Sequence, residues 1–132
     1  MDKNNPRNYD EWLEKAHEDE LAAIDLFKKS HLYAPACFHY QQLAEKYLKA
    51  LLIYQGKSFL KVHDLISLSD LLCENYPEIK KLDPELKLLN RFYIETRYPG
   101  SESDFTLHDA QRADFASIKI KSFVLKIINQ KN

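Results

Sequence analysis

Glycine is scarce in this chain, with two residues among 132, Gly56 and Gly100. Strand-rich folds need many tight turns with positive φ, where glycine is favoured, so this scarcity predicts helices joined by few loops. It also excludes a glycine-rich loop that cradles phosphates. The sequence therefore favours an all-α fold.

Cysteine is equally sparse. Cys37 and Cys73 lie far apart and neither belongs to a C-x-x-C pair, so we interpret them as buried thiols in a reducing compartment rather than as a disulfide. There is no H-E-x-x-H motif and no paired Cys/His spacing, and we therefore expect no metal and no cofactor.

An excess of charge and a long apolar run are also missing. Nineteen basic and twenty acidic residues leave a net charge of −1, so any RNA contact has to come from a local patch, and sequence-specific DNA binding is not expected. No apolar run approaches the roughly 20 residues of a membrane span, and the N-terminal residues show no signal peptide. We expect a soluble cytoplasmic protein, with residues 1–132 forming one domain and no membrane contact.

What the chain does have is apolar residues at helical spacing. The second such segment has an apolar arc wider than half its circumference, which predicts a central helix. Pro35 suits its first turn, Gly56 its end, and Asp83-Pro84 reads as the cap and first residue of the fourth. We predict an up-and-down antiparallel bundle of about five helices. The segments are about Asp10 to Ser30, Ala34 to Gln55, His63 to Asn75, Asp83 to Arg97, and the stretch after the capping box Thr106–Asp109.

Polar residues of the second helix lie opposite its apolar arc. They are Gln42, Glu45, Lys46 and Lys49. One interpretation is a solvated face with a Glu45–Lys49 ion pair at i,i+4 spacing. The other is a binding face on which Lys46 and Lys49 contact a phosphate and Gln42 donates a hydrogen bond.

The fourth helix is expected to end near Arg97, because the residue before Pro99 is disfavoured in the α region. Arg97 is either a cation on the last helical carbonyls or a functional residue held by the rigid corner Tyr98-Pro99. His108 follows after a polar loop and is a candidate partner for it. His63-Asp64, by contrast, reads as a helix cap rather than a catalytic dyad.

Four motifs in this order resemble the HEPN domain family. The first is W-x-x-x-A at Trp12 and Ala16, and the second is the helix sequence FHYQQLAEKYLKALL at residues 38–52. The others are H-D-L from His63 and Y-x-x-x-R-Y-P from Tyr93. The resemblance covers nearly the whole chain. It implies a helical bundle that dimerises, binds nucleotide or RNA, and is often encoded beside a minimal nucleotidyltransferase as a toxin–antitoxin-like pair.

Ribonuclease members of that family carry an arginine followed, after four to six residues, by a histidine. From Arg97 this spacing falls on Glu102, Ser103 and Asp104, and His108 comes later. The arginine of the motif is therefore present, and the histidine at the expected spacing is absent.

Three hypotheses follow. The first is a homodimeric module that binds nucleotide or RNA and pairs with a nucleotidyltransferase, with phosphate contacts from Arg97, Lys46, Lys49 and Gln42. Its tyrosines would stack on bases or fill the dimer interface. The second is a metal-independent RNA-cleaving toxin that uses Arg97 with a displaced His108. The third is an interaction domain without a ligand.

Overall fold

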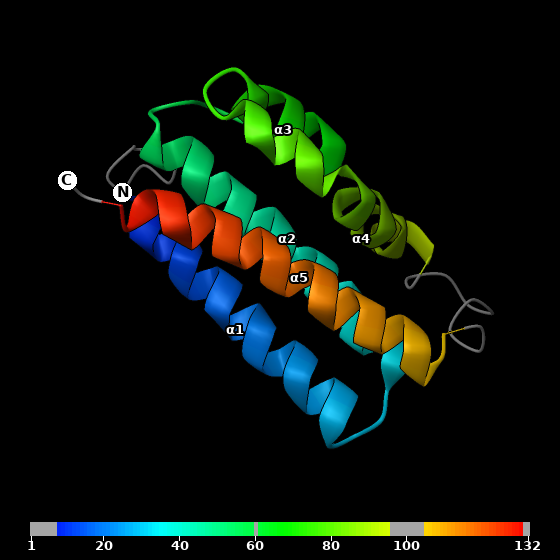
Figure 1. The fold of residues 1–132 in the computed structure, drawn as a ribbon. Helices are drawn as coiled ribbons and strands as arrows, with labels where there is room; N and C mark the ends of the chain where they lie inside the picture. Colours follow the sequence, from blue (N-terminus) through cyan, green and yellow to red (C-terminus); the bar gives the residue numbers. More distant parts are fainter. Residues whose placement is uncertain (1–7, 60, 96–104, 131–132) are drawn as a thin grey trace.

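The described part of the chain forms a bundle of five α-helices, with a short 3-10 helix before the fourth (Figure 1). This computed structural model describes residues 8–59, 61–95 and 105–130, and those residues contain no strand. The predicted all-α bundle of about five helices is thus confirmed. The elements are α1 (Tyr9–Lys28), α2 (Tyr33–Tyr54), α3 (Leu65–Cys73), η2 (Pro77–Leu82), α4 (Asp83–Glu95) and α5 (Leu107–Ile128).

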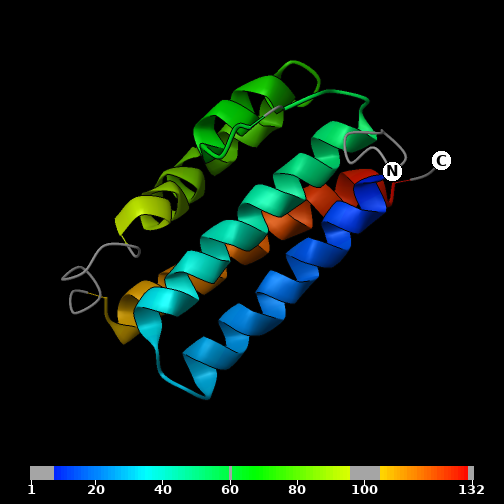
Figure 2. The same cartoon turned by 180° about the vertical axis from the view of Figure 1, so that it is seen from behind.

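Helix α2 is the centre of the bundle and packs against α1, α3, α4 and α5. Helix α1 lies to one side of it and α3 and α4 to the other, while α5 crosses in front of α2 in Figure 1 and behind it in Figure 2 and packs against both α2 and α4. Helix α1 runs antiparallel to α2, and α4 runs antiparallel to α5. Along α2, Leu48, Leu51, Leu52 and Ile53 are fully buried, which agrees with a helix whose apolar arc covers most of its circumference.

One interpretation of the polar residues of α2 was a solvated face, and this is wrong for Glu45 and Lys49. Glu45 and Lys49 are each only 4% exposed. Neighbouring helices therefore enclose part of this polar face, and Glu45 and Lys49 have to find partners inside the protein.

Local sequence signals end and begin several helices as predicted. Gly56 has φ of 79°, and its N–H donates to Ile53 O while Lys57 N donates to Leu52 O, both at 2.9 Å. These two bonds form a Schellman motif, for which a residue with positive φ is needed. Thr106 and Asp109 form the predicted capping box at the start of α5, and Asp64 caps α3 by accepting from Ile66 N.

Other boundaries differ from prediction. Asp83 has helical dihedral angles (φ −50°, ψ −44°), so it continues the chain from η2 into α4 and does not cap α4. The 3-10 helix itself was not predicted, because a Pro77 that ends one helix also fits the first turn of the next. Helix α3 is shorter than predicted at both ends.

Some smaller expectations are tested directly. Cys37 and Cys73 are both free thiols, and burial raises the pKa of Cys37 to about 12. Glu20 of α1 and Lys121 of α5 join these two helices, because the Glu20 carboxylate accepts from Lys121 Nζ at 2.9 and 3.0 Å. No helix in the described part of the chain is long and apolar enough to cross a membrane.

Candidate functional site

The predicted corner of Arg97, Tyr98 and Pro99 lies outside the described residues. Its two flanks are described: α4 ends at Glu95 and α5 begins at Leu107. The rings of Phe92 and Phe105 are 5.5 Å apart, so the chain on either side of the corner returns to one place in the core. His108 is exposed in the first turn of α5.

The described polar residues of α2 form two networks, each centred on a carboxylate. In the first, Asp19 on α1 faces His39 and Lys46 on α2. His39 Nδ1 lies 2.9 Å from Asp19 Oδ1, and Lys46 Nζ donates to Oδ2 at 2.5 Å. Burial by itself would raise the pKa of Asp19, but the hydrogen bonds from His39 and Lys46, together with their charge, outweigh it and hold that pKa below its usual value.

The second network is centred on Glu45 of α2. Its Oε2 accepts from Lys49 Nζ at 2.8 Å and lies 2.8 Å from Nδ1 of His63. Its Oε1 accepts from Gln41 Nε2 at 3.3 Å, and Gln42 Nε2 donates in turn to Gln41 Oε1 at 2.7 Å. Every carboxylate oxygen of Glu45 is therefore satisfied inside the protein, as a buried charge requires.

Aromatic rings cover the cation of the second network. Lys49 Nζ lies 5.0 Å from the ring centre of Phe59 and 5.6 Å from that of Trp12. The faces of aromatic rings carry negative charge density, so both contacts favour a buried ammonium group. The side chain of Lys49 is 5% exposed, which leaves little of it accessible to a phosphate.

Four aromatic rings lie next to one another and come from α2, from α4 and from the residues just before α3. We call them the ring row: His39, Phe38, Tyr93 and His63. The ring centres are 5.6 Å apart between His39 and Phe38 and 6.4 Å between Phe38 and Tyr93. His63 and Tyr93 are stacked at 5.7 Å with 10° between their planes. The side chain of His63 is 50% exposed and that of His39 is 32% exposed.

The predicted phosphate-binding residues of α2 thus differ in exposure. Gln42 and Lys46 are partly exposed on α2, beside the ring row, while Lys49 is buried beneath aromatic rings. The residues that sequence reasoning missed are His39 and Tyr93. His39 had a signal in the sequence, because it lies three residues before Gln42 and seven before Lys46 and therefore shares their side of α2. Tyr93 comes from another helix, and no local spacing places it beside α2.

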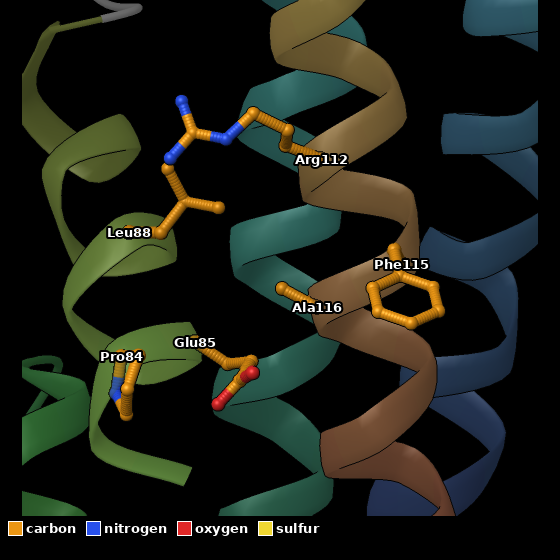
Figure 3. Close-up of a pocket in the computed structure, with 6 residues that line it drawn as sticks. All are labelled: Pro84, Glu85, Leu88, Arg112, Phe115 and Ala116. Carbon is orange, nitrogen blue, oxygen red and sulfur yellow. The ribbon is translucent and has the colours of Figure 1, made fainter.

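A groove between α4 and α5 lies apart from this face (Figure 3). Arg112 extends from α5 toward Leu88 on α4, and Glu85 points from α4 toward α5. Its volume of about 210 Å³ is below the ~300–1,000 Å³ of typical small-molecule sites. Among the described residues no group of three or more His, Cys, Asp or Glu side chains is placed to hold a metal ion.

The structure defines a small all-α domain in which a central helix, α2, is packed against four others. The model of the HEPN domain family matches residues 9–128. The chain belongs to the HEPN domain family.

Two solved structures are similar to it. TT1696 from Thermus thermophilus has 30% sequence identity and a TM-score of 0.84, over 90% of this chain and 97% of that chain. ST0689, described as an archaeal HEPN homologue, has 28% identity and a TM-score of 0.73, over 91% of this chain and 97% of that one. A search of curated proteins found no match.

Proposed function

We propose that this protein is a HEPN module that binds nucleotide or RNA, acts as a homodimer, and pairs with a minimal nucleotidyltransferase in a toxin–antitoxin-like system. The observation that carries the binding function is the partly exposed face of α2, on which Gln42 and Lys46 lie beside two histidines held by carboxylates. On a chain with a net charge of −1, such a local cluster is the place where a phosphate can be bound.

In this proposal Arg97 is the principal phosphate ligand, held by the Tyr98-Pro99 corner, and Lys46 and Gln42 assist it. An arginine suits this role because its planar guanidinium can donate two parallel hydrogen bonds to a phosphate. Lys49 contributes indirectly, by keeping Glu45 in place, because its own Nζ is enclosed by Trp12 and Phe59.

A second function, metal-independent RNA cleavage by Arg97 with His108, is favoured by one observation. His108 is exposed at the start of α5, and the Phe92–Phe105 contact joins the two ends of the segment that carries Arg97. In such a reaction a histidine takes the proton of the ribose 2′-hydroxyl and the 2′-oxygen bonds to phosphorus, while the bond from phosphorus to the 5′-oxygen of the next nucleotide breaks and that oxygen leaves with a proton from water. Arginine stabilises the charge on the phosphate oxygens.

The homodimer is supported by the outer face of α5, where Phe115 is 62% exposed and Ile118 is 46% exposed. Large apolar side chains on neighbouring turns of one helix are typical of a surface that another chain covers. Light scattering of the wild type should give twice the 15.6 kDa mass of the chain, and Phe115→Ser should shift the mass toward the monomer. A wild-type monomer at micromolar concentration would contradict the dimer.

The binding function is tested by incubating the protein with total RNA, a tRNA pool and ATP, without added metal. Arg97→Ala, His108→Ala and the exposed control Lys87→Ala are compared with the wild type. Binding without cleavage, weakened only by Arg97→Ala, supports the proposal. Cleavage that both Arg97→Ala and His108→Ala abolish establishes the ribonuclease instead. If neither binding nor cleavage is detected, the domain is an interaction domain without a ligand.

A further inference from the structure

His63 is held from two directions although half of it is exposed. Its Nδ1 lies 2.8 Å from Glu45 Oε2, and its ring is stacked on Tyr93 with centres 5.7 Å apart. A surface histidine is normally free to rotate about its side-chain bonds. A ring that is already fixed loses little conformational entropy when a ligand stacks on it.

The carboxylate that holds His63 is itself immobile. Glu45 is 5% exposed at its side chain and also accepts from Lys49 and Gln41. Apolar residues of similar volume generally stabilise a helix interior as well as a buried ion pair does, so stability alone is a weak reason for this network. One effect that apolar residues would not reproduce is a histidine ring with a fixed orientation at the surface.

The opposite end of the ring row is built in the same way. His39 Nδ1 lies 2.9 Å from Asp19 Oδ1, and His39 and His63 are joined through Phe38 and Tyr93. When Nδ1–H donates to a carboxylate, Nε2 of a neutral ring is left as an acceptor. Within the described residues, Nε2 of these two rings has no hydrogen-bond partner.

We propose that the ring row binds the unpaired base of a ribonucleotide, with the base stacking on His63 and its phosphate directed toward Lys46 and Gln42. This inference rests on the proposed nucleotide or RNA binding and narrows it to ligands whose bases are accessible. Stacking on protein rings requires a base that is not enclosed in a duplex. Gln42 and Lys46 lie one and two turns beyond Phe38 on the same side of α2. Groups that can bind a phosphate therefore lie beside the ring row.

The test measures affinity by fluorescence anisotropy for a single-stranded oligoadenylate, for the same strand annealed to its complement, and for ATP. The wild type should bind the single strand at least tenfold more tightly than the duplex. His63→Ala should weaken single-strand binding by about tenfold, since a stacked base contributes roughly 1–3 kcal/mol, which corresponds to about five- to 150-fold.

The choice of variants separates stacking from a general structural effect. His63→Phe keeps an aromatic ring and should retain more affinity than His63→Ala, whereas His63→Gln keeps a hydrogen-bonding group without a ring and should be as weak as alanine. His17→Ala is the matched control, because His17 is a 60% exposed histidine that also contacts a carboxylate, Glu20, at 3.4 Å. It should bind like the wild type.

The outcomes distinguish this inference from the function on which it rests. If RNA binds and Arg97→Ala weakens it, but duplex binds as well as single strand or His63→Ala binds like the wild type, the ring row is not the base site while the proposed function stands. If no RNA and no ATP binds, both fail. ATP bound as tightly as the oligonucleotide identifies a free nucleotide as the ligand, and the oligonucleotide alone identifies RNA.

Discussion

Two carboxylates, Asp19 of α1 and Glu45 of α2, each contact one lysine and one histidine, but the two lysines differ in burial. Asp19 holds Lys46 and His39 at the border of α1 and α2, where the lysine side chain is 25% exposed. Glu45 holds Lys49 and His63, and its lysine is 5% exposed beneath two aromatic rings. The same set of side chains therefore forms a partly solvated contact at one site and an interior ion pair at the other.

The two sites differ in how much free energy it costs to leave one charge without its partner. At the Asp19 site, water reaches the lysine, and His39 still contacts Asp19 when Lys46 is removed, so the Lys46 contact contributes little to stability. At the Glu45 site, removal of the cation leaves a carboxylate in an enclosed position, which is costly. The comparison predicts that matched substitutions at the two sites differ in effect.

The largest effect is expected from Lys49→Ala, which should lower the free energy of unfolding by about 3–5 kcal/mol, because Glu45 loses its charged partner in the interior. Lys46→Ala at the Asp19 site is the matched control and should cost no more than about 1 kcal/mol. Urea denaturation followed by circular dichroism measures both. Equal costs for the two lysines would show that the Glu45 site is solvated after all.

An acid titration sharpens the comparison with a smaller effect. The folded-state pKa of Asp19 is lowered, so its charged form contributes stability above the unfolded pKa of about 3.9, and this contribution is lost as pH falls through the lower, folded pKa. Asp19→Asn should therefore be less stable than the wild type by about 1 kcal/mol at pH 7.

The stability difference between wild type and Asp19→Asn should shrink once pH falls below the unfolded pKa of Asp19, and it vanishes only below the lower, folded pKa, where Asp19 is protonated in both states. Thermal unfolding between pH 7 and about pH 2.5, below the unfolded pKa, measures it. A difference that stays constant across this range would mean that the charge of Asp19 contributes nothing and that its pKa is not lowered in the folded protein.

The helices and their order follow from the sequence for identifiable reasons. Apolar spacing located all five α-helices, Gly56 marked the end of α2, and Thr106 with Asp109 marked the start of α5. These signals are local, because they depend on residues within one or two turns of each other. The same locality explains why η2 was missed, since Pro77 is compatible with both a stop and a start.

The polar face of α2 was only partly predictable because its environment is tertiary. The i,i+4 spacing gave the Glu45–Lys49 pair correctly, but nothing in that spacing shows that Trp12, from another helix, and Phe59 enclose it. The pair His63-Asp64 was interpreted as a helix cap, and Asp64 fills that role. Its contact with Glu45 joins residues 18 positions apart, and no local rule predicts it.

The smallest effect is expected where the histidines are removed. His39→Ala and His63→Ala should each lower the free energy of unfolding by less than about 1 kcal/mol, because each ring is partly solvated and its carboxylate keeps a lysine partner. Urea denaturation of both variants beside the wild type measures the costs. If His63→Ala instead cost as much as Lys49→Ala, His63 would be a structural member of the Glu45 site, and its half-exposed ring would owe its orientation to stability and not to a ligand.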